Sequence, residues 1–293
     1  MVTTDSVCDL PEPLKKEFGI SVCPYYVCTD QGRFMDELEL KADELLVHIA
    51  GGKHGVSEPP NVEDYERFFA ERLTEAQNVI HITMAKHVSQ GYQNAVEAAK
   101  SFENVTVVDS GHVSSSMGLA VLYAAYMAEN HATKGEIIDN VKRLRRYISS
   151  AFIIDSTHMM CRTGRIPKRV QILCDALLLH PVMRLRNSRM VVGGLEMGSF
   201  RHVTKGYIRK TLSDTRSIDR RILFITYAGM DERSLQYIQE LVQQHCPFER
   251  VYLQKASSAI SSNCGPGSFG LLFMRKNEVE IEFSKASDWE TTN

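Results

Sequence analysis

The feature of this sequence that most constrains its fold is the alternation of short apolar runs with longer segments of helical periodicity. The apolar runs have the length of strands and occupy residues 1–6, 78–85, 105–110, 151–157 and 220–229. Runs this short are typical of buried strands, whereas the segments between them repeat their apolar residues with the period of a helix. This order predicts an α/β fold in which helices cover both faces of a mainly parallel sheet.

Two of the predicted helices have distinctive sequences. The segment 61–73 opens with Asn61, an expected N-cap, and has Asp64 three residues later, as in a capping box. The segment 114–130 is apolar on nearly all sides, so we expect it to form a helix buried between two layers.

The alternation changes after residue 157. Residues 180–194 have the pattern of two strands joined by a turn at Asn187 and Ser188, and residues 201–212 form a basic helical segment. We therefore predict two α/β domains. Residues 1–157 hold the mainly parallel sheet, and residues 158–293 hold a smaller mixed sheet.

Composition and simple motifs exclude several classes of protein. The 293 residues carry a net charge of -2, so no global positive field favours nucleic acid. The seven cysteines form no C-x-x-C pair, the ten histidines have no metal-binding spacing, and no P-loop motif is present. The chain has no signal-peptide pattern and no apolar run of the roughly 18 residues that a membrane span needs. We expect a cytoplasmic protein that does not span a membrane and has no metal or cofactor.

Three of the predicted strands end in the same dipeptide, at Asp5–Ser6, Asp109–Ser110 and Asp155–Ser156. Ligands of open α/β sheets bind beyond the carboxyl ends of the strands, so these pairs are candidates to line one crevice. The alternative is that each pair caps the helix that follows, which needs only local geometry.

The segment NCGPGSFG, residues 263–270, contains the outline G-x-G-x-x-G of a dinucleotide-binding loop. Such a loop must open a helix, but the residues that follow, LLFMRK, predict a strand. Pro266 also lacks a backbone donor for a phosphate. The segment therefore predicts a tight glycine turn that either approaches a ligand closely or is a plain turn.

Arginines are the remaining candidates for binding. Arg162 and Arg165 flank Gly164, and Arg201 opens the basic segment 201–212. Each of these arginines can pair with an anionic head group, or it can lie in solvent on the surface.

Six segments resemble, in the same order along the chain, the motifs of the DegV family. The segments, each with its family motif, are TTDSVCDLP (T-D-S-x-x-D-L-P), VSEPPNVEDYERFF (T-S-Q-P-S and the helix after it), ITMAKHVSQGYQNA (S-G-[ST]-Y-x-x-A), VVDSGHVSSSMG (V-x-D-S-x-x-x-S-x-G), CRTGRI (G-G-R-I) and NCGPGSFG (H-x-G-P-G-x-x-G). The matches cover nearly the whole chain, and six motifs in order are specific even though each alone is weak.

The resemblance implies a two-domain α/β protein that binds one long-chain fatty acid between its domains. Some members of the family are the lipid-carrying, non-catalytic subunits of a fatty acid kinase, whose separate ATP-using subunit phosphorylates the carboxylate. A partner subunit of this kind is therefore expected here. The glycine turn at 263–270 would then lie beside a carboxylate and not beside a nucleotide phosphate.

Carried over position by position, the resemblance implies a set of head-group residues. The expected ligand-binding residues are Val56, Ser57, Ser89, Gln90, Arg201, Asn263 and Gly265.

The chain departs from the family pattern within this set. Val56 stands at a family threonine, Gln90 and Gly91 replace a glycine and a serine or threonine, and Asn263 replaces a histidine. The sequence therefore does not fix the length or branching of the bound acid, and another amphiphile is an alternative ligand.

Two other functions remain open from the sequence. One is a phosphotransfer enzyme that acts at the Asp-Ser strand ends. The other is a degenerate regulatory module that binds a protein and no lipid.

Overall fold

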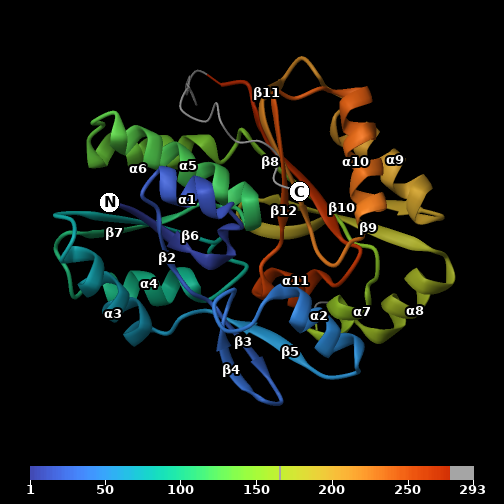
Figure 1. The fold of residues 1–293 in the computed structure, drawn as a ribbon, viewed down its shortest axis with the longest axis horizontal. Coiled ribbons are helices and arrows are strands. Elements are labelled where there is room, and N and C mark those ends of the chain that lie inside the picture. The colour runs from blue at the N-terminus through green and yellow to red at the C-terminus, as the bar shows by residue number, and fades with distance from the viewer. Residues whose placement is uncertain (165, 278–293) are drawn as a thin grey trace.

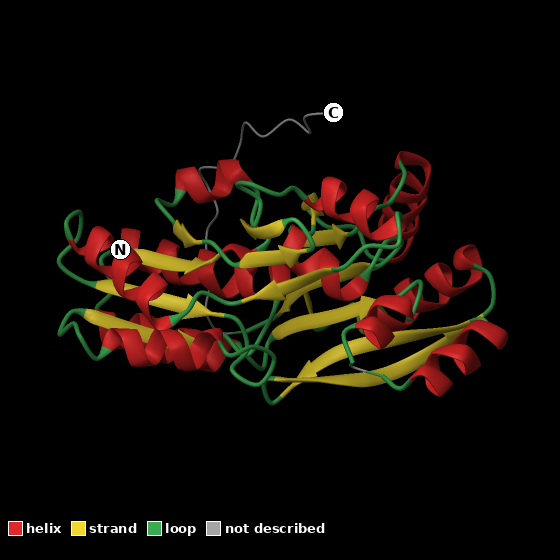
Figure 2. Ribbon diagram, turned by 90° about the horizontal axis from the view of Figure 1, so that it is seen from below, coloured by secondary structure: helices red, strands yellow, loops and turns green. Residues whose placement is uncertain are grey.

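The computed structural model describes residues 1–164 and 166–277, which form three sheets and the helices around them (Figure 1). The parallel sheet lies toward the N-terminal end of the molecule, and the mixed sheet lies beside it (Figure 2). Arg165 and residues 278–293 of the predicted second domain lie outside the described residues.

The first sheet is wholly parallel. Its strands, in spatial order, are β2 (Ser21–Cys23), β1 (Val2–Asp5), β6 (Val79–Thr83) and β7 (Val105–Asp109). One face packs on α3 (Val62–Leu73) and α4 (Gly91–Ala99), and the other on α1 (Glu12–Glu17), α5 (Ser114–Glu129) and α6 (Lys134–Leu144). Neighbouring residues of β6 point to opposite faces, since Val79 lies in the core under α3 and Ile80 in the core under α5. The predicted α/β arrangement is therefore confirmed.

The start of α3 is fixed by the predicted capping box. Asn61 Oδ1 accepts a hydrogen bond from the Asp64 amide at 2.8 Å, and the Asp64 carboxylate accepts one from the Asn61 amide at 3.2 Å. The pair satisfies two backbone donors that would otherwise have no partner within the helix.

The second sheet is mixed and has six strands. In spatial order they are β10 (Arg189–Met197), β9 (Leu179–Arg186), β8 (Ile148–Ile153), β13 (Phe269–Arg275), β11 (Ile218–Tyr227) and β12 (Arg250–Lys255). Its outer face packs on α9 (Phe200–Thr211) and α10 (Glu232–His245). Asn187 and Ser188 have φ of 50° and 59° and form the predicted turn between β9 and β10.

Two expectations about this sheet are wrong. The mixed sheet is larger than the parallel sheet, not smaller. The strand expected at 151–157 belongs to β8, which pairs with β13 and β9 in the mixed sheet and not with the first sheet. Its antiparallel partner β13 lies far along the chain and leaves no local signal. The domain boundary at residue 157 stays a prediction, because strand pairing alone does not define a folding unit.

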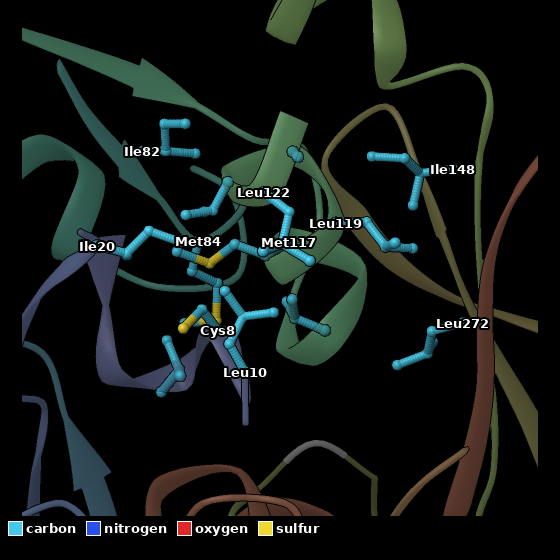
Figure 3. Close-up of a cluster of buried hydrophobic side chains, with 14 of the residues drawn as sticks. Cys8, Leu10, Ile20, Ile82, Met84, Met117, Leu119, Leu122, Ile148 and Leu272 are labelled. Atoms are coloured by element: carbon cyan, nitrogen blue, oxygen red, sulfur yellow. The ribbon is translucent and has the colours of Figure 1, made fainter. Parts of the chain in front are cut away.

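Helix α5 lies between the two sheets, as its apolar sequence predicted. Residues 114–125 of this helix are all buried. Figure 3 shows Met117, Leu119 and Leu122 of α5 with Ile82 of the parallel sheet on one side and Leu272 of the mixed sheet on the other. The helix therefore joins the two sheets through one continuous core.

A third, three-stranded antiparallel sheet was not predicted. Its strands, in spatial order, are β4 (Gly32–Met35), β3 (Tyr26–Thr29) and β5 (Gly55–Glu58). Seven other short elements were also missed: η1 (Ser6–Cys8), α1, β2, α2 (Ala42–Ala50), α7 (His158–Arg162), α8 (Lys168–Ala176) and α11 (Ser258–Cys264). Helix α11 packs against β5 and α2. This contact joins the third sheet, in the N-terminal third of the chain, to residues 258–264.

Candidate functional site

A cavity of about 850 Å³ lies among the two large sheets, the third sheet and α11. Most of its wall is apolar. Met84 and Val113 come from the loops that follow β6 and β7 of the parallel sheet, Phe152 and Met183 come from the mixed sheet, and Ile154 directly follows β8. This volume and this apolar wall fit a small-molecule ligand with a long apolar part.

Polar groups gather where the third sheet meets α11. Asn263 Nδ2, near the end of α11, donates to Ser57 Oγ of β5 at 2.9 Å. Close by, the hydroxyls of Tyr25 and Ser89 are 2.9 Å apart, and the Gly91 amide donates to Ser89 Oγ at 3.1 Å. The two hydrogen-bonded pairs lie near each other, because Tyr25 directly precedes β3, which pairs with β5. The cavity therefore has a polar end made of hydroxyl and amide groups.

Three carboxylates hold the N-terminal end of α11 in place. The amides of Ser257, Ser258 and Ala259 donate to Asp9, Glu37 and Asp36 respectively, at 2.8–2.9 Å. These amides have no acceptors within the helix, and the carboxyl oxygens supply them. Helix α11 is therefore fixed to the N-terminal part of the chain, and this fixes Asn263 beside Ser57.

The Asp9 carboxyl group is buried behind the cavity. Burial is the main cause that raises the pKa of Asp9 to about 7, and the nearby Asp36 raises it further. Hydrogen bonds from Ser114 Oγ and from the Ser257 amide act in the opposite direction.

Most of the predicted ligand-binding residues are brought together by the fold. Those that line the cavity are Val56, Ser57, Ser89, Gln90 and Asn263. Gly265 lies just behind the wall, where it ends α11 with a φ of 74°. Whether these residues bind a ligand stays a prediction.

Arg201 is the exception, since the structure does not bring it to the cavity. Its side chain is exposed at the start of α9, and its guanidinium carbon lies 4.8 Å from the centroid of the Tyr237 ring. The basic character of the segment 201–212 drew attention to Arg201, but it does not show the direction in which the Arg201 side chain points.

Arg162, in contrast, lines the cavity. Its guanidinium group donates to the Lys53 carbonyl and lies 3.2 Å from His54 Nδ1. This arginine therefore connects α7 to the segment that leads into β5.

The Asp-Ser strand ends do not line the cavity. Asp5 accepts hydrogen bonds from the Tyr65 hydroxyl at 2.7 Å and the Met84 amide at 3.1 Å, and Asp109 accepts one from the Gly111 amide at 2.8 Å. Asp5 makes no side-chain cap to η1. The carboxylates of Asp5 and Asp109 accept hydrogen bonds from donors in buried segments. They therefore neither line one common crevice nor cap the helices that follow them.

The glycine turn leads into β13, as the sequence predicted, and it follows α11, which was not predicted. Gly267 has a φ of 78°, and a Cβ atom on it would lie 2.7 Å from Asp155 Oδ2. The turn opens no helix, so it lacks the geometry of a dinucleotide-binding loop.

Sequence reasoning missed Tyr25 at the polar end. Tyr25 stands in the apolar run CPYYV, which predicts a core residue. No sequence motif links Tyr25 to Ser89, its hydrogen-bond partner.

The described residues contain neither a membrane-spanning helix nor a metal-binding cluster. In residues 1–164 and 166–277, no helix is long and apolar enough to cross a bilayer. The same residues hold no cluster of three or more His, Cys, Asp or Glu side chains placed to bind a metal.

The fold and the site define a class of α/β protein with a parallel sheet, a mixed sheet and a largely apolar cavity between them. The family model for DegV, described as an uncharacterised protein of the DegV family, matches residues 1–276. The chain belongs to the DegV family.

Known proteins of this family resemble the chain over nearly its whole length. A DegV domain-containing protein of Caldanaerobacter subterraneus is 25% identical over 279 residues, which are 94% of this chain and 98% of that protein. A solved structure from Thermus thermophilus, titled as fatty acid binding of a DegV family protein, has a TM-score of 0.84 and 27% identity. It covers 94% of this chain and 99% of its own.

A more distant structure has the same fold. A DegV family protein from Eubacterium eligens loaded with heptadecanoic acid has a TM-score of 0.80 at 18% identity, with 94% of this chain and 99% of its own covered.

Proposed function

We propose that this chain binds a long-chain fatty acid in the cavity and presents its carboxylate to a separate kinase subunit. The observation that carries the first part is the form of the cavity, which has a long apolar wall and one polar end. The Thermus thermophilus relative, titled as fatty acid binding, supports the choice of ligand.

The two ends of such a ligand would have different roles. Each buried methylene group contributes roughly 0.8 kcal/mol, so the tail supplies most of the affinity. A carboxylate taken out of water must be hydrogen-bonded, or it will take up a proton. The hydroxyl groups of Ser57 and Ser89 would supply those bonds, and Asn263 would orient Ser57 by donating to it.

The kinase part of the proposal rests on the family resemblance. We infer that the chain alone does not catalyse phosphoryl transfer, because the Asp-Ser strand ends lie outside the cavity wall. All seven cysteines are free thiols, which suits the cytoplasm, where we propose that the protein acts.

Two experiments test the two parts separately. Denaturing extraction of the purified protein, followed by mass spectrometry, should yield about one acyl chain per protein, and delipidated protein should bind hexadecanoic acid in a calorimetric titration. Absence of both results would contradict lipid binding and favour a regulatory module that binds no lipid. Incubation with ATP and hexadecanoic acid should give no acyl phosphate without a kinase subunit, and turnover by the lone chain would favour the enzyme.

A further inference from the structure

Tyr25 lines the polar end of the cavity, where its hydroxyl group contacts Ser89. Tyr25 is 2% exposed, and its hydroxyl oxygen is 2.9 Å from Ser89 Oγ. Among the described residues, Ser89 is the hydrogen-bond partner that the structure gives to this phenol. The function of Tyr25 therefore depends on which of the two hydroxyls is the donor.

The position of Tyr25 requires glycine at residue 91. A Cβ atom on Gly91 would overlap the Tyr25 hydroxyl and would lie 3.2 Å from the Tyr65 hydroxyl. The motif that this segment resembles has serine or threonine there. In this chain the tyrosine hydroxyl occupies the space that such a side chain would need, so Tyr25 and Gly91 form a matched pair.

The direction of the hydrogen bond follows from the available protons. A hydroxyl group has one proton to donate and two lone pairs to accept. If Ser89 donated to Tyr25, the phenol proton would be buried without an acceptor, because among the described residues Ser89 is the hydrogen-bond partner of the Tyr25 hydroxyl. A buried donor without a partner is costly, so Tyr25 donates and Ser89 accepts.

This assignment leaves one group free at Ser89. Ser89 Oγ accepts from the Gly91 amide and from Tyr25, which uses both of its lone pairs. Its own proton then has no acceptor in this pair and is available to the cavity. A chain of hydrogen bonds of this kind also polarises its last donor and strengthens it.

We propose that Tyr25 is a positioning residue for the ligand's head group. It directs the Ser89 proton into the cavity and makes the site select a hydrogen-bond acceptor such as a carboxylate. The inference rests on the proposed function and names the side chain that sets the polarity of its binding site.

The test is a double-mutant cycle with Tyr25→Phe and Ser89→Ala, measured by calorimetric titration with hexadecanoic acid. Tyr25→Phe should weaken binding about tenfold, because Ser89 loses the bond that orients it. In the Ser89→Ala background the same change should alter affinity by less than about twofold, because Tyr25 acts through Ser89. An equal loss in both backgrounds, or no loss in the first, would overturn the inference.

A second ligand separates positioning from a structural effect. Binding of 1-hexadecanol, which has the same chain length and an uncharged head, should fall by less than about threefold in Tyr25→Phe, since bonds to charged groups are the stronger ones. An equal loss for the acid and the alcohol would mean that the cavity has changed shape, and would overturn the inference.

Two further variants serve as controls. Tyr26→Phe is a matched control, since its ring stacks on Arg33 outside the cavity, and it should bind as the unchanged chain does. Gly91→Ala, which pushes the Tyr25 hydroxyl aside, should weaken binding of the acid even if Tyr25→Phe does not fold. Unchanged affinity in every Tyr25 and Gly91 variant would leave the proposed function intact and overturn this inference alone. Failure of the unchanged chain to bind hexadecanoic acid would overturn both.

Discussion

Asn263 Nδ2 donates a hydrogen bond of 2.9 Å to Ser57 Oγ and so joins two residues that are 206 positions apart in the chain. The same amide group also lies 2.9 Å from the Ala259 carbonyl and 3.1 Å from Ser262 Oγ, both within α11. Asn263 therefore connects the end of α11 to β5 across the polar end of the cavity. In the resembled motif this position is histidine.

The first prediction concerns this connection. We expect Asn263→Ala to weaken binding of hexadecanoic acid by several-fold to tenfold, because Ser57 loses the donor that holds its hydroxyl in place, at a cost of about 1 kcal/mol. Calorimetric titration checks the affinity, and thermal unfolding checks that the fold is kept. Asn263→Asp should show a similar loss, since it keeps the size of the side chain but removes the donor. Affinity equal to that of the unchanged chain in both variants would show that the bond does not shape the binding site.

The second prediction concerns Arg201, the predicted ligand-binding residue that lies away from the cavity. Arg201→Ala should leave affinity for hexadecanoic acid within about twofold, because the side chain lies over Tyr237 and away from the cavity. Its contact with the ring is exposed and contributes only about 0.5–1 kcal/mol to stability. Ser89→Ala, titrated in parallel, should lose about 1.5–3 kcal/mol of binding free energy. A comparable loss in Arg201→Ala would mean that the arginine reaches the ligand after all.

The parts of the fold that could be predicted are those with a local cause. The buried strands of the parallel sheet, the capping box at Asn61 and the apolar helix 114–130 all carry their signal within a few residues. Strand β8 was assigned to the wrong sheet because its pairing with β13 is decided by packing between distant segments. The third sheet was missed because its strands have only four residues each and alternate weakly.

The candidate site shows the same division. Ser57, Ser89 and Asn263 could be found because each lies in a short motif that resembles a family pattern. Tyr25 could not be found, because its importance comes from the space left by Gly91 and not from its own neighbours in sequence. Arg201 does not reach the cavity, because the basic character of its segment gives a position in the chain but not the direction in which the side chain points.

The third prediction concerns Asp9 and the pH dependence of stability. The pKa of Asp9 is raised by burial to about 7 in the folded chain, against 3.8 as its ordinary value. The folded chain therefore keeps this proton between pH 4 and 7 while the unfolded chain releases it, so the contribution of Asp9 to stability falls as the pH rises through this window.

Asp9→Asn tests this dependence, because the amide imitates the protonated carboxyl group at every pH. The free energy of unfolding of the variant, minus that of the unchanged chain, should increase between pH 4 and 7 by on the order of 4 kcal/mol and then level off. Urea denaturation at several pH values measures the difference. A difference that stays constant across the window would mean that Asp9 is ionised in the folded chain throughout.

The fourth prediction concerns His112, whose effect has the opposite sign. Burial is the main cause that lowers the pKa of His112 to about 4, against 6.5 as its ordinary value, and it outweighs the hydrogen bond to the Arg145 carbonyl, which raises the pKa. The ring is buried, and its Nε2 lies 2.9 Å from the Arg145 carbonyl, so Nε2 carries a proton and donates it. The unfolded chain binds a proton here between pH 6.5 and 4 while the folded chain does not, so stability is lost as the pH falls through this window.

His112→Gln should remove this loss, because the glutamine amide can donate to the same carbonyl and does not titrate. We expect the stability of the variant, relative to the unchanged chain, to rise by on the order of 3 kcal/mol as the pH falls from 6.5 to 4. The windows of Asp9 and His112 overlap and their slopes oppose each other, so the unchanged chain should show only a weak net dependence from these two groups. Urea denaturation of Asp9→Asn, His112→Gln and the double variant over pH 4–8 separates the two contributions. If the free energy of unfolding of His112→Gln follows the same pH profile as that of the unchanged chain, His112 contributes no pH dependence to stability, and the prediction is wrong.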